Sequence, residues 1–171
     1  MLVIGRCRSF AASIMSKFAV RKPVVVDEIN LELSDEMDPS FPIELVLEAV
    51  PLSLQASARS RDAWKNDIRA EINNVLDPAG WATQSPIRVT ILYFPDGPMY
   101  GDIDNIVKPI LDSLMPRIYV DDNQVQRVWV EKFESDRSFQ FEDPTPRLAS
   151  AVETDRPVVY IRVDNEASSD K

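Results

Sequence analysis

The stretch Ile87-Arg88-Val89-Thr90-Ile91-Leu92-Tyr93-Phe94, followed at once by Pro95-Asp96-Gly97-Pro98, decides the fold of this 171-residue chain. β-Branched and aromatic side chains fill most of the first eight positions, and such side chains favour a strand. The prolines and the glycine that follow are typical of a turn. We therefore expect a strand at residues 87–94 that ends in a loop, and we place the other elements around it.

Helical spacing of apolar residues appears on both sides of this strand in the sequence. Residues 59–76 bring Trp64 and Ile68 to one side of a helix. Residues 104–114 repeat apolar side chains in the same way, and Pro109 is tolerable there because it lies near the first turn and a half. We therefore expect two main helices, one before and one after the strand.

Several shorter runs read as further strands because they are apolar or alternate and are bounded by turn residues. The order of strands and helices predicts an α+β fold, a single domain with a small mixed sheet and two main helices. The expected additional strands are residues 43–50, 118–120, 124–133 and 157–163.

Composition divides the chain into one folded part and flanking segments. Residues 1–40 hold an acidic, proline-bounded run and are expected to be a flexible N-terminal extension and linker. Residues 41–164 are expected to form the domain, with a polar insertion near 134–156. We expect residues 165–171 to be a disordered tail.

The residues that are missing restrict the possible chemistry. The chain contains no histidine and a single cysteine, Cys7, which excludes His-based triads, His-ligated metals and thiolate zinc sites. No apolar run reaches the roughly 18 residues of a membrane span, so we expect no membrane association. The single cysteine makes a reducing cytoplasm the expected compartment. The formal net charge of −9 argues against binding a polyanion through the overall field, although a local basic face is compatible with it.

A group of carboxylates near the second helix carries the candidate chemistry. Asp102 and Asp104 are separated by one residue at a junction between loop and helix, and Asp122 follows a later strand. Three carboxylates with water and a phosphate oxygen are sufficient ligands for Mg²⁺. Lys108 lies one helical turn beyond Asp104 and could reach a phosphate, so the group suits metal-assisted phosphodiester hydrolysis.

Each of these residues has an ordinary structural explanation when taken singly. Asp102 or Asp104 can cap a helix, Asp104 and Lys108 can form an exposed ion pair, and Asp121-Asp122 can simply make a turn. A helix–loop–helix calcium site fits poorly, because Asp102 as first ligand puts Val107 where glycine is required. Only the combination favours a metal site.

The acids, the lysine and two nearby amides form a spaced pattern: Asp102-x-Asp104-Asn105-x-x-Lys108, then Asp112, Asp121-Asp122 and Gln124-Val125. This pattern resembles the signature of RusA-type crossover junction endodeoxyribonucleases. Pro51-x-Ser53-x-Gln55 and Trp64-Lys65 are also similar to one branch of that family. The resemblance covers roughly residues 43–132.

The resemblance implies a Mg²⁺-dependent endonuclease, with Mn²⁺ as a possible substitute, that cuts four-way (Holliday) junctions in DNA recombination and repair. It implies Asp102, Asp104 and Asp122 as metal ligands and Lys108 as the catalytic lysine. Asp112 matches a further aspartate of the motif, to which no specific role is given. A homodimer at the nucleoid is implied as well. Residues expected to contact DNA are Asn105 and the basic row Arg59, Arg61, Lys65 and Arg69 at the start of the first helix.

Two alternatives remain open at this point. A module that keeps the fold and binds nucleic acid or protein without cutting it would explain the acidic charge. A phosphohydrolase of small substrates would use the same carboxylates. Metal-dependent nicking of a synthetic junction, compared with nucleotide hydrolysis, discriminates among the three.

Overall fold

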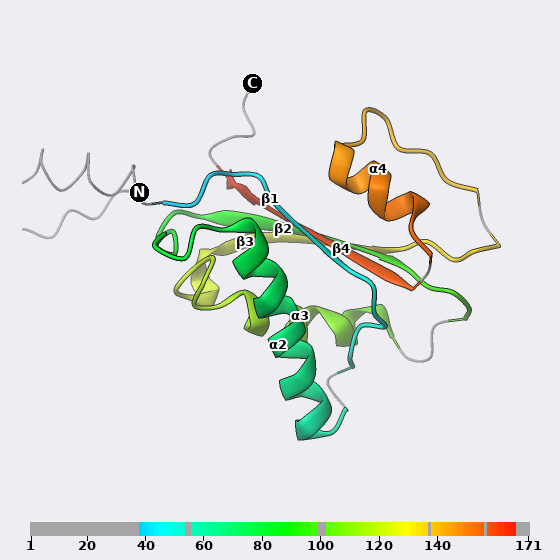
Figure 1. Ribbon diagram of the computed structural model, residues 1–171, viewed down its shortest axis with the longest axis horizontal. Helices are drawn as coiled ribbons and strands as arrows, with labels where there is room; N and C mark the ends of the chain where they lie inside the picture. Colours follow the sequence, from blue (N-terminus) through cyan, green and yellow to red (C-terminus); the bar gives the residue numbers. More distant parts are fainter. Residues whose placement is uncertain (1–37, 54–55, 99–101, 137, 156, 167–171) are drawn as a thin grey trace, which may run out of the picture.

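A mixed four-stranded sheet organises the protein in the computed structural model, which describes residues 38–53, 56–98, 102–136, 138–155 and 157–166. The strand order is β1-β4-β2-β3 (Figure 1). β4 runs antiparallel to both of its neighbours, whereas β2 and β3 are parallel. The strands are β1 (Ile43–Leu47), β2 (Ile87–Phe94), β3 (Val125–Lys132) and β4 (Val158–Asn165).

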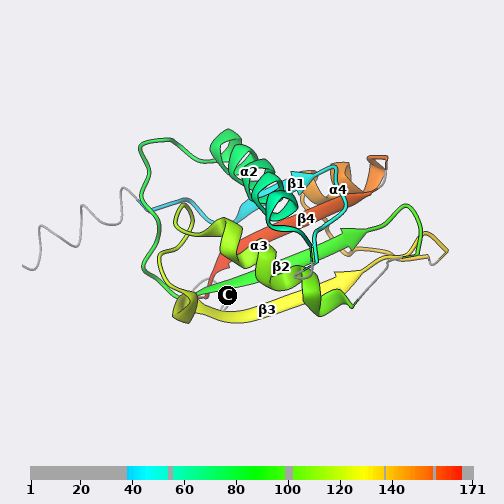
Figure 2. The same cartoon turned by 90° about the horizontal axis from the view of Figure 1, so that it is seen from below.

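Helices cover both faces of the sheet. α2 (Ala58–Val75) and α3 (Val107–Leu114) lie together on one face, and α4 (Pro146–Glu153) lies on the other (Figures 1 and 2). Short 3-10 turns η1 (Ile103–Ile106) and η2 (Asp122–Gln124) precede α3 and β3. The connection from β2 through η1, α3 and η2 to β3 is therefore the crossover that a parallel strand pair requires.

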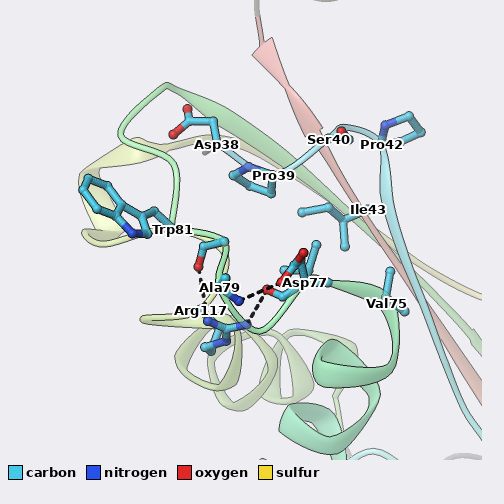
Figure 3. Close-up of a pocket in the computed structure, with 12 residues that line it drawn as sticks. Asp38, Pro39, Ser40, Pro42, Ile43, Val75, Asp77, Ala79, Trp81 and Arg117 are labelled. Carbon is cyan, nitrogen blue, oxygen red and sulfur yellow. Dashed lines mark hydrogen bonds between the residues drawn. The ribbon is translucent and has the colours of Figure 1, made fainter. Parts of the chain in front are cut away.

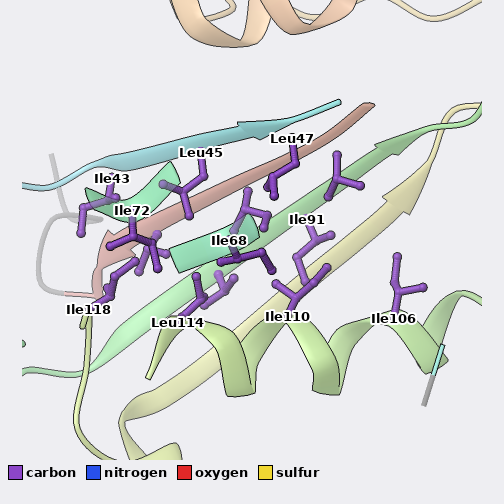
Figure 4. Close-up of a cluster of buried hydrophobic side chains, with 14 of the residues drawn as sticks. Ile43, Leu45, Leu47, Ile68, Ile72, Ile91, Ile106, Ile110, Leu114 and Ile118 are labelled. Atoms are coloured by element: carbon purple, nitrogen blue, oxygen red, sulfur yellow. The ribbon is translucent and has the colours of Figure 1, made fainter. Parts of the chain in front are cut away.

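The main core lies between the sheet and the pair α2 and α3 (Figure 4). Alternate residues of the strands point toward these helices, as the two-residue period of a strand dictates. Ile68 of α2 and Ile110 of α3 are fully buried against them. Replacing Ile68 or Ile110 with alanine would lower the free energy of unfolding by about 2–5 kcal/mol, the usual range for such buried side chains. Other members of this core are Leu45, Ile72, Ile91, Ile106, Leu114 and Ile118.

A second, smaller cluster holds α4 on the opposite face. Leu148 and Ala151 of α4 pack there with Phe94 and Tyr160, and Phe133, Phe139 and Phe141 gather around the ring of Phe94. Polar contacts help to fix the helix, because Glu44 of β1 accepts hydrogen bonds from Thr145 and Tyr160. Burial and the bond to Glu44 raise the pKa of Tyr160 to about 12.

The predicted α+β class, with a mixed sheet in one domain, is confirmed. β2 has the predicted bounds, and α2 begins and ends one residue before residues 59–76. The predicted helix at residues 104–114 is present as η1 continued by α3. The segment 118–120 is not a strand, because Tyr119 makes only a single bridge to Thr83.

The ends and the insertion depart further from expectation. The segment 134–156, expected as a polar insertion, contains α4 with two buried apolar residues. β4 continues to Asn165, one residue into the predicted tail, and residues 167–171 lie outside the described part. Most of the predicted extension, residues 1–37, also lies outside it. Asp38, at its end, accepts a hydrogen bond of 2.9 Å from the Thr83 hydroxyl and so belongs to the fold.

Candidate active site

Asp102 and Asp104 lie where the chain enters the crossover after β2. Asp102 occupies the position before η1 in extended conformation, and its carbonyl accepts the first hydrogen bond of the turn, from the Asn105 amide at 3.1 Å. Its carboxylate makes no capping bond. Among the described residues, neither Asp102 nor Asp104 has a side-chain partner, and both are exposed. The ordinary explanations, a cap or an ion pair, therefore do not account for these two acids.

Lys108 on α3 joins two other acids. Its Nζ lies 2.6 Å from Asp112 and 3.3 Å from Asp122, so the ammonium reaches forward along the helix and away from Asp104. These hydrogen bonds raise the pKa of Lys108 above its ordinary value. Asp122 and Lys108 are each about half exposed, at 55% and 52%, so the pair is open to solvent and to a ligand.

The turn before β3 exposes the Asp122 side chain, and the side chains of Asp121 and Gln124 bind the backbone of the same turn. Asp121 caps η2 by accepting a hydrogen bond from the Asn123 amide at 2.8 Å. The Gln124 side chain accepts from the amides of Val120 and Asp121 and donates to carbonyls of the loop that precedes β2. Asp121 is thus used within the fold, and the Asp122 carboxylate is left to face Lys108.

A cavity of about 270 Å³ opens beside Asp102. It lies between the loop after β1, with Val50 and Pro51, and the turn after β2, with Asp96. Burial, with the nearby charge of Asp96, raises the pKa of the Tyr93 hydroxyl in its wall. Sequence reasoning assigned Asp96 only to a turn, and its position two residues after the end of β2 was the available signal for a second acid near Asp102.

The structure does not bring the three predicted ligands into one group. No cluster of three or more His, Cys, Asp or Glu side chains suited to a metal ion occurs among the described residues. The reason is the parallel pair: Asp102 and Asp104 follow β2 at its carboxyl end, whereas Asp122 precedes β3 at its amino end, and α3 lies between them. Their donor chemistry nevertheless fits a hard cation, because carboxylate oxygens are the ligands that Mg²⁺ prefers.

The predicted DNA contacts lie on the same helical face of the sheet as these acids. α2 buries Trp64 against the core, and its basic row lies beside this buried face. α2 packs against α3 on one face of the sheet (Figure 2), and the acids flank α3 in the sequence. Arg59 and Arg69 are exposed, whereas Arg61, Lys65 and Asn105 are half-buried.

A larger cavity, of about 570 Å³, lies at the other end of α2 (Figure 3). Arg117 and Trp81 line it, and the Arg117 guanidinium donates to the carbonyls of Asp77 and Gly80. None of the predicted metal ligands borders this cavity. Arg117 is therefore engaged in fixing the loop after α2.

A family profile described as Endodeoxyribonuclease RusA matches residues 53–140, just over half of the chain. The chain belongs to the RusA family. The match contains α2, the crossover and β3, and hence every candidate site residue named above. RusA membership supports a hydrolase that acts on DNA phosphodiester bonds, of the junction-resolving type. A comparison with individually curated proteins gave no significant match.

No helix of the described residues combines the length and apolar character that a membrane span requires.

Proposed function

We propose that this RusA-family protein is a Mg²⁺-dependent endonuclease that cuts branched DNA, four-way junctions above all, during recombination and repair. The observation that carries the proposal is the pair of exposed carboxylates Asp102 and Asp104, which have no partner among the described residues and lie within the family match. An acid that the fold does not use for capping or ion pairing is available for a ligand.

Asp102, Asp104 and Asp122 are the residues proposed to hold the ion. When bound, Mg²⁺ (or Mn²⁺) would supply a lowered pKa for its water and charge neutralisation at the phosphate. Lys108 is proposed to bind a phosphate oxygen and to stabilise the negative charge that builds up there.

The proposal requires Asp122 to exchange partners. In the structure its carboxylate pairs with Lys108 at 3.3 Å. A phosphate that binds Lys108 would compete for that ammonium and free the Asp122 carboxylate, and the turn that carries Asp122 must then move toward Asp102 and Asp104 for the three acids to share one ion. Because the Lys108–Asp122 pair is half exposed, breaking it costs little.

DNA binding is assigned to the basic residues of α2, Arg59, Arg61, Lys65 and Arg69, together with Asn105. The local charge of this row would meet phosphates despite the net charge of −9. A homodimer is proposed, so that two sites can cut two strands. Branched DNA as substrate would place the protein at the nucleoid, in the cytoplasm.

The site is tested with Asp102→Asn, Asp104→Asn and Asp122→Asn. Each substitution removes a negative oxygen ligand and retains the size of the side chain. We expect each variant to lose cleavage of a four-way junction by about 100-fold or more, because metal activation of water contributes several kcal/mol. The free energy of unfolding, measured by thermal denaturation, should change by less than about 0.5 kcal/mol, since exposed positions away from core contacts tolerate such substitutions.

Asp136→Asn is the matched control, because Asp136 is exposed and lies outside the crossover. It should cleave at the wild-type rate. Wild-type cleavage by any of the three test variants would remove that residue from the proposed ligand set, and binding of Mn²⁺ measured by calorimetry would show whether metal affinity fell with it.

A second candidate is a RusA-like module that binds nucleic acid or protein without cutting. It is favoured by the net charge of −9 and by the separation of the three acids, which form no cluster among the described residues. Tight junction binding without nicking, in the presence of Mg²⁺ or Mn²⁺, would support this candidate over the nuclease.

A further inference from the structure

The cavity of about 570 Å³ at the carboxyl end of α2 has the features of a binding site of its own (Figure 3). Its volume falls within the range of pockets that bind small organic ligands, about 300–1,000 Å³. None of the proposed metal ligands borders it, and none of the basic residues assigned to DNA does. The cavity therefore lies outside the proposed nuclease site, and its side chains can recognise a different chemical group.

Apolar side chains form much of the wall of this cavity. Ile43 and Val75 lie toward one end in Figure 3, and Trp81 lies toward the other. Trp81 is 64% exposed, although it carries one of the largest apolar side chains. Its indole offers a flat surface on which another planar ring can stack. The remaining apolar residues of the wall are Pro39, Pro42, Leu76 and Ala79.

Arg117 gives the cavity hydrogen-bond donors that are only partly used. Its Nη1 and Nη2 donate to the carbonyls of Gly80 and Asp77 at 3.4 and 3.3 Å, which is longer than the usual range of about 2.7–3.2 Å. Its Nε is buried and has no partner among the described residues. A guanidinium carries five N–H donors, so Arg117 retains donors for a further acceptor.

Asp38 gives the same cavity an acceptor. Its Oδ2 accepts the hydrogen bond from the Thr83 hydroxyl at 2.9 Å, and its Oδ1 has no hydrogen-bond partner in the part of the chain that the structure describes. The bond to Thr83 holds the carboxylate at the wall. The cavity therefore combines a carboxylate acceptor, a guanidinium donor and the flat ring of Trp81.

The charges of the wall favour an uncharged ligand over a phosphate. Asp77 also lines the cavity, and its Oδ1 accepts a hydrogen bond from the Ala79 amide at 2.8 Å. Two carboxylates thus stand against one guanidinium, and a phosphate would be repelled more than attracted. A neutral ring with N–H donors and with oxygen or nitrogen acceptors on its edge suits both Asp38 and Arg117.

We propose that this cavity binds a single unstacked nucleobase. A nucleobase combines a planar ring with donors and acceptors on its edge, and aspartate and arginine are among the side chains that pair with base edges. Proteins commonly bind unpaired bases by stacking them on an aromatic side chain, here Trp81. The base belongs either to a free nucleoside or to an unpaired position in a strand, and both present the same ring to the wall.

The indole N–H signals in the NMR spectrum of the nitrogen-labelled full chain test the proposal. Of the three tryptophans, Trp64 is buried, whereas Trp81 and Trp129 are similarly exposed, at 64% and 61%. Adenosine or cytidine, titrated without metal or DNA, should shift the Trp81 signal with a dissociation constant of about 0.1–1 mM, as expected for a ligand of this size. Trp129 is the internal control, and its signal should stay in place.

Trp81→Ala should raise the dissociation constant of the nucleosides by about tenfold or more, because it removes the stacking surface. Saturation transfer from the protein to the nucleoside protons measures this change without the Trp81 signal. Trp129→Ala is the matched control and should bind as the wild type does. Since both residues are exposed, both variants should keep the wild-type fold, which circular dichroism checks.

Ribose 5-phosphate lacks the base and should leave the Trp81 signal in place. A short single strand and a fully paired duplex then distinguish the two sources of the base. A shift with the single strand but not with the duplex assigns the cavity to an unpaired base of a strand, and a shift with nucleosides alone assigns it to free nucleosides.

Three results would overturn the proposal. They are a Trp81 signal that no nucleoside and no single strand shifts, an equal shift with ribose 5-phosphate, and unchanged nucleoside binding in Trp81→Ala. Because the test measures no cleavage and changes no proposed metal ligand, each of these results leaves the nuclease proposal standing.

Discussion

Lys108 lies between two carboxylates, Asp112 at 2.6 Å and Asp122 at 3.3 Å. At the scale of single residues this is the most specific contact of the candidate site, because it connects α3 with the turn before β3. In the proposed mechanism, Lys108 would bind the phosphate, and Asp122, its partner in the structure, would bind the ion. Substitution of Lys108 therefore separates the role of the cation from that of the metal ligands.

We predict that Lys108→Ala slows junction cleavage by about 100-fold while metal binding is retained, because it removes one positive group from the charged transition state and no oxygen ligand. Single-turnover rates measure the first effect and calorimetric titration with Mn²⁺ the second. Lys132→Ala is the control, since Lys132 likewise forms an ion pair, with Glu134 at 2.7 Å, but lies outside the candidate site. An unchanged rate in Lys108→Ala would exclude this residue from the mechanism.

The sequence predicted the positions of the site residues better than the directions of their side chains. Asp102 and Asp104 were predicted at the junction between a loop and a helix, and they lie at the start of η1, whereas their role as metal ligands stays a prediction. Lys108 was expected on the face of Asp104, whereas its ammonium pairs with Asp112 and Asp122. Spacing along a helix gives the position of a side chain but not the direction in which a flexible lysine extends.

At the scale of elements, Gln124 connects three pieces of chain. Its side chain accepts from the amides of Val120 and Asp121 and donates to the carbonyls of Thr83 and Ser85, at 2.8 to 3.1 Å. This one amide thereby fixes the turn that carries Asp122 against the loop before β2. In place of the expected strand, residues 118–120 form a bend with a single bridge from Tyr119 to Thr83.

We predict that Gln124→Ala destabilises the protein by about 1–3 kcal/mol, because four backbone groups lose their partner. Cleavage should fall as well, since Asp122 loses its fixed position. Denaturant unfolding and the junction assay measure the two effects. Gln126→Ala is the matched control, as Gln126 is exposed and makes one such bond, to Asn123, at 2.9 Å. Equal effects of the two substitutions would contradict the role given to Gln124.

Elements with strong periodicity were predicted well, and α4 was not. β2 and α2 carry regular patterns over eight and eighteen residues. α4 has only eight residues within a polar segment, although Thr145 as cap and Pro146 in the first turn were available signals. Its burial depends on aromatic residues contributed by β2 and by the chain after β3, which no local pattern reveals.

At the scale of the whole molecule, the sheet order determines where the acids lie. β2 and β3 are parallel, so the crossover that joins them separates its first acids from its last. Sequence could predict both groups and the helix between them, but it could not predict the direction of β3. That direction depends on the pairing of strands distant in the chain and explains why a ready-made group of three acids is missing among the described residues.

Junction cleavage by the wild-type protein tests the central claim most directly. A labelled synthetic four-way junction and a linear duplex of the same sequence are incubated with the full chain, with and without Mg²⁺. We predict paired, symmetric nicks in the junction with Mg²⁺, none with a chelator, and at least about tenfold slower cutting of the duplex. Junction binding without any nicks in Mg²⁺ or Mn²⁺ would contradict the nuclease assignment.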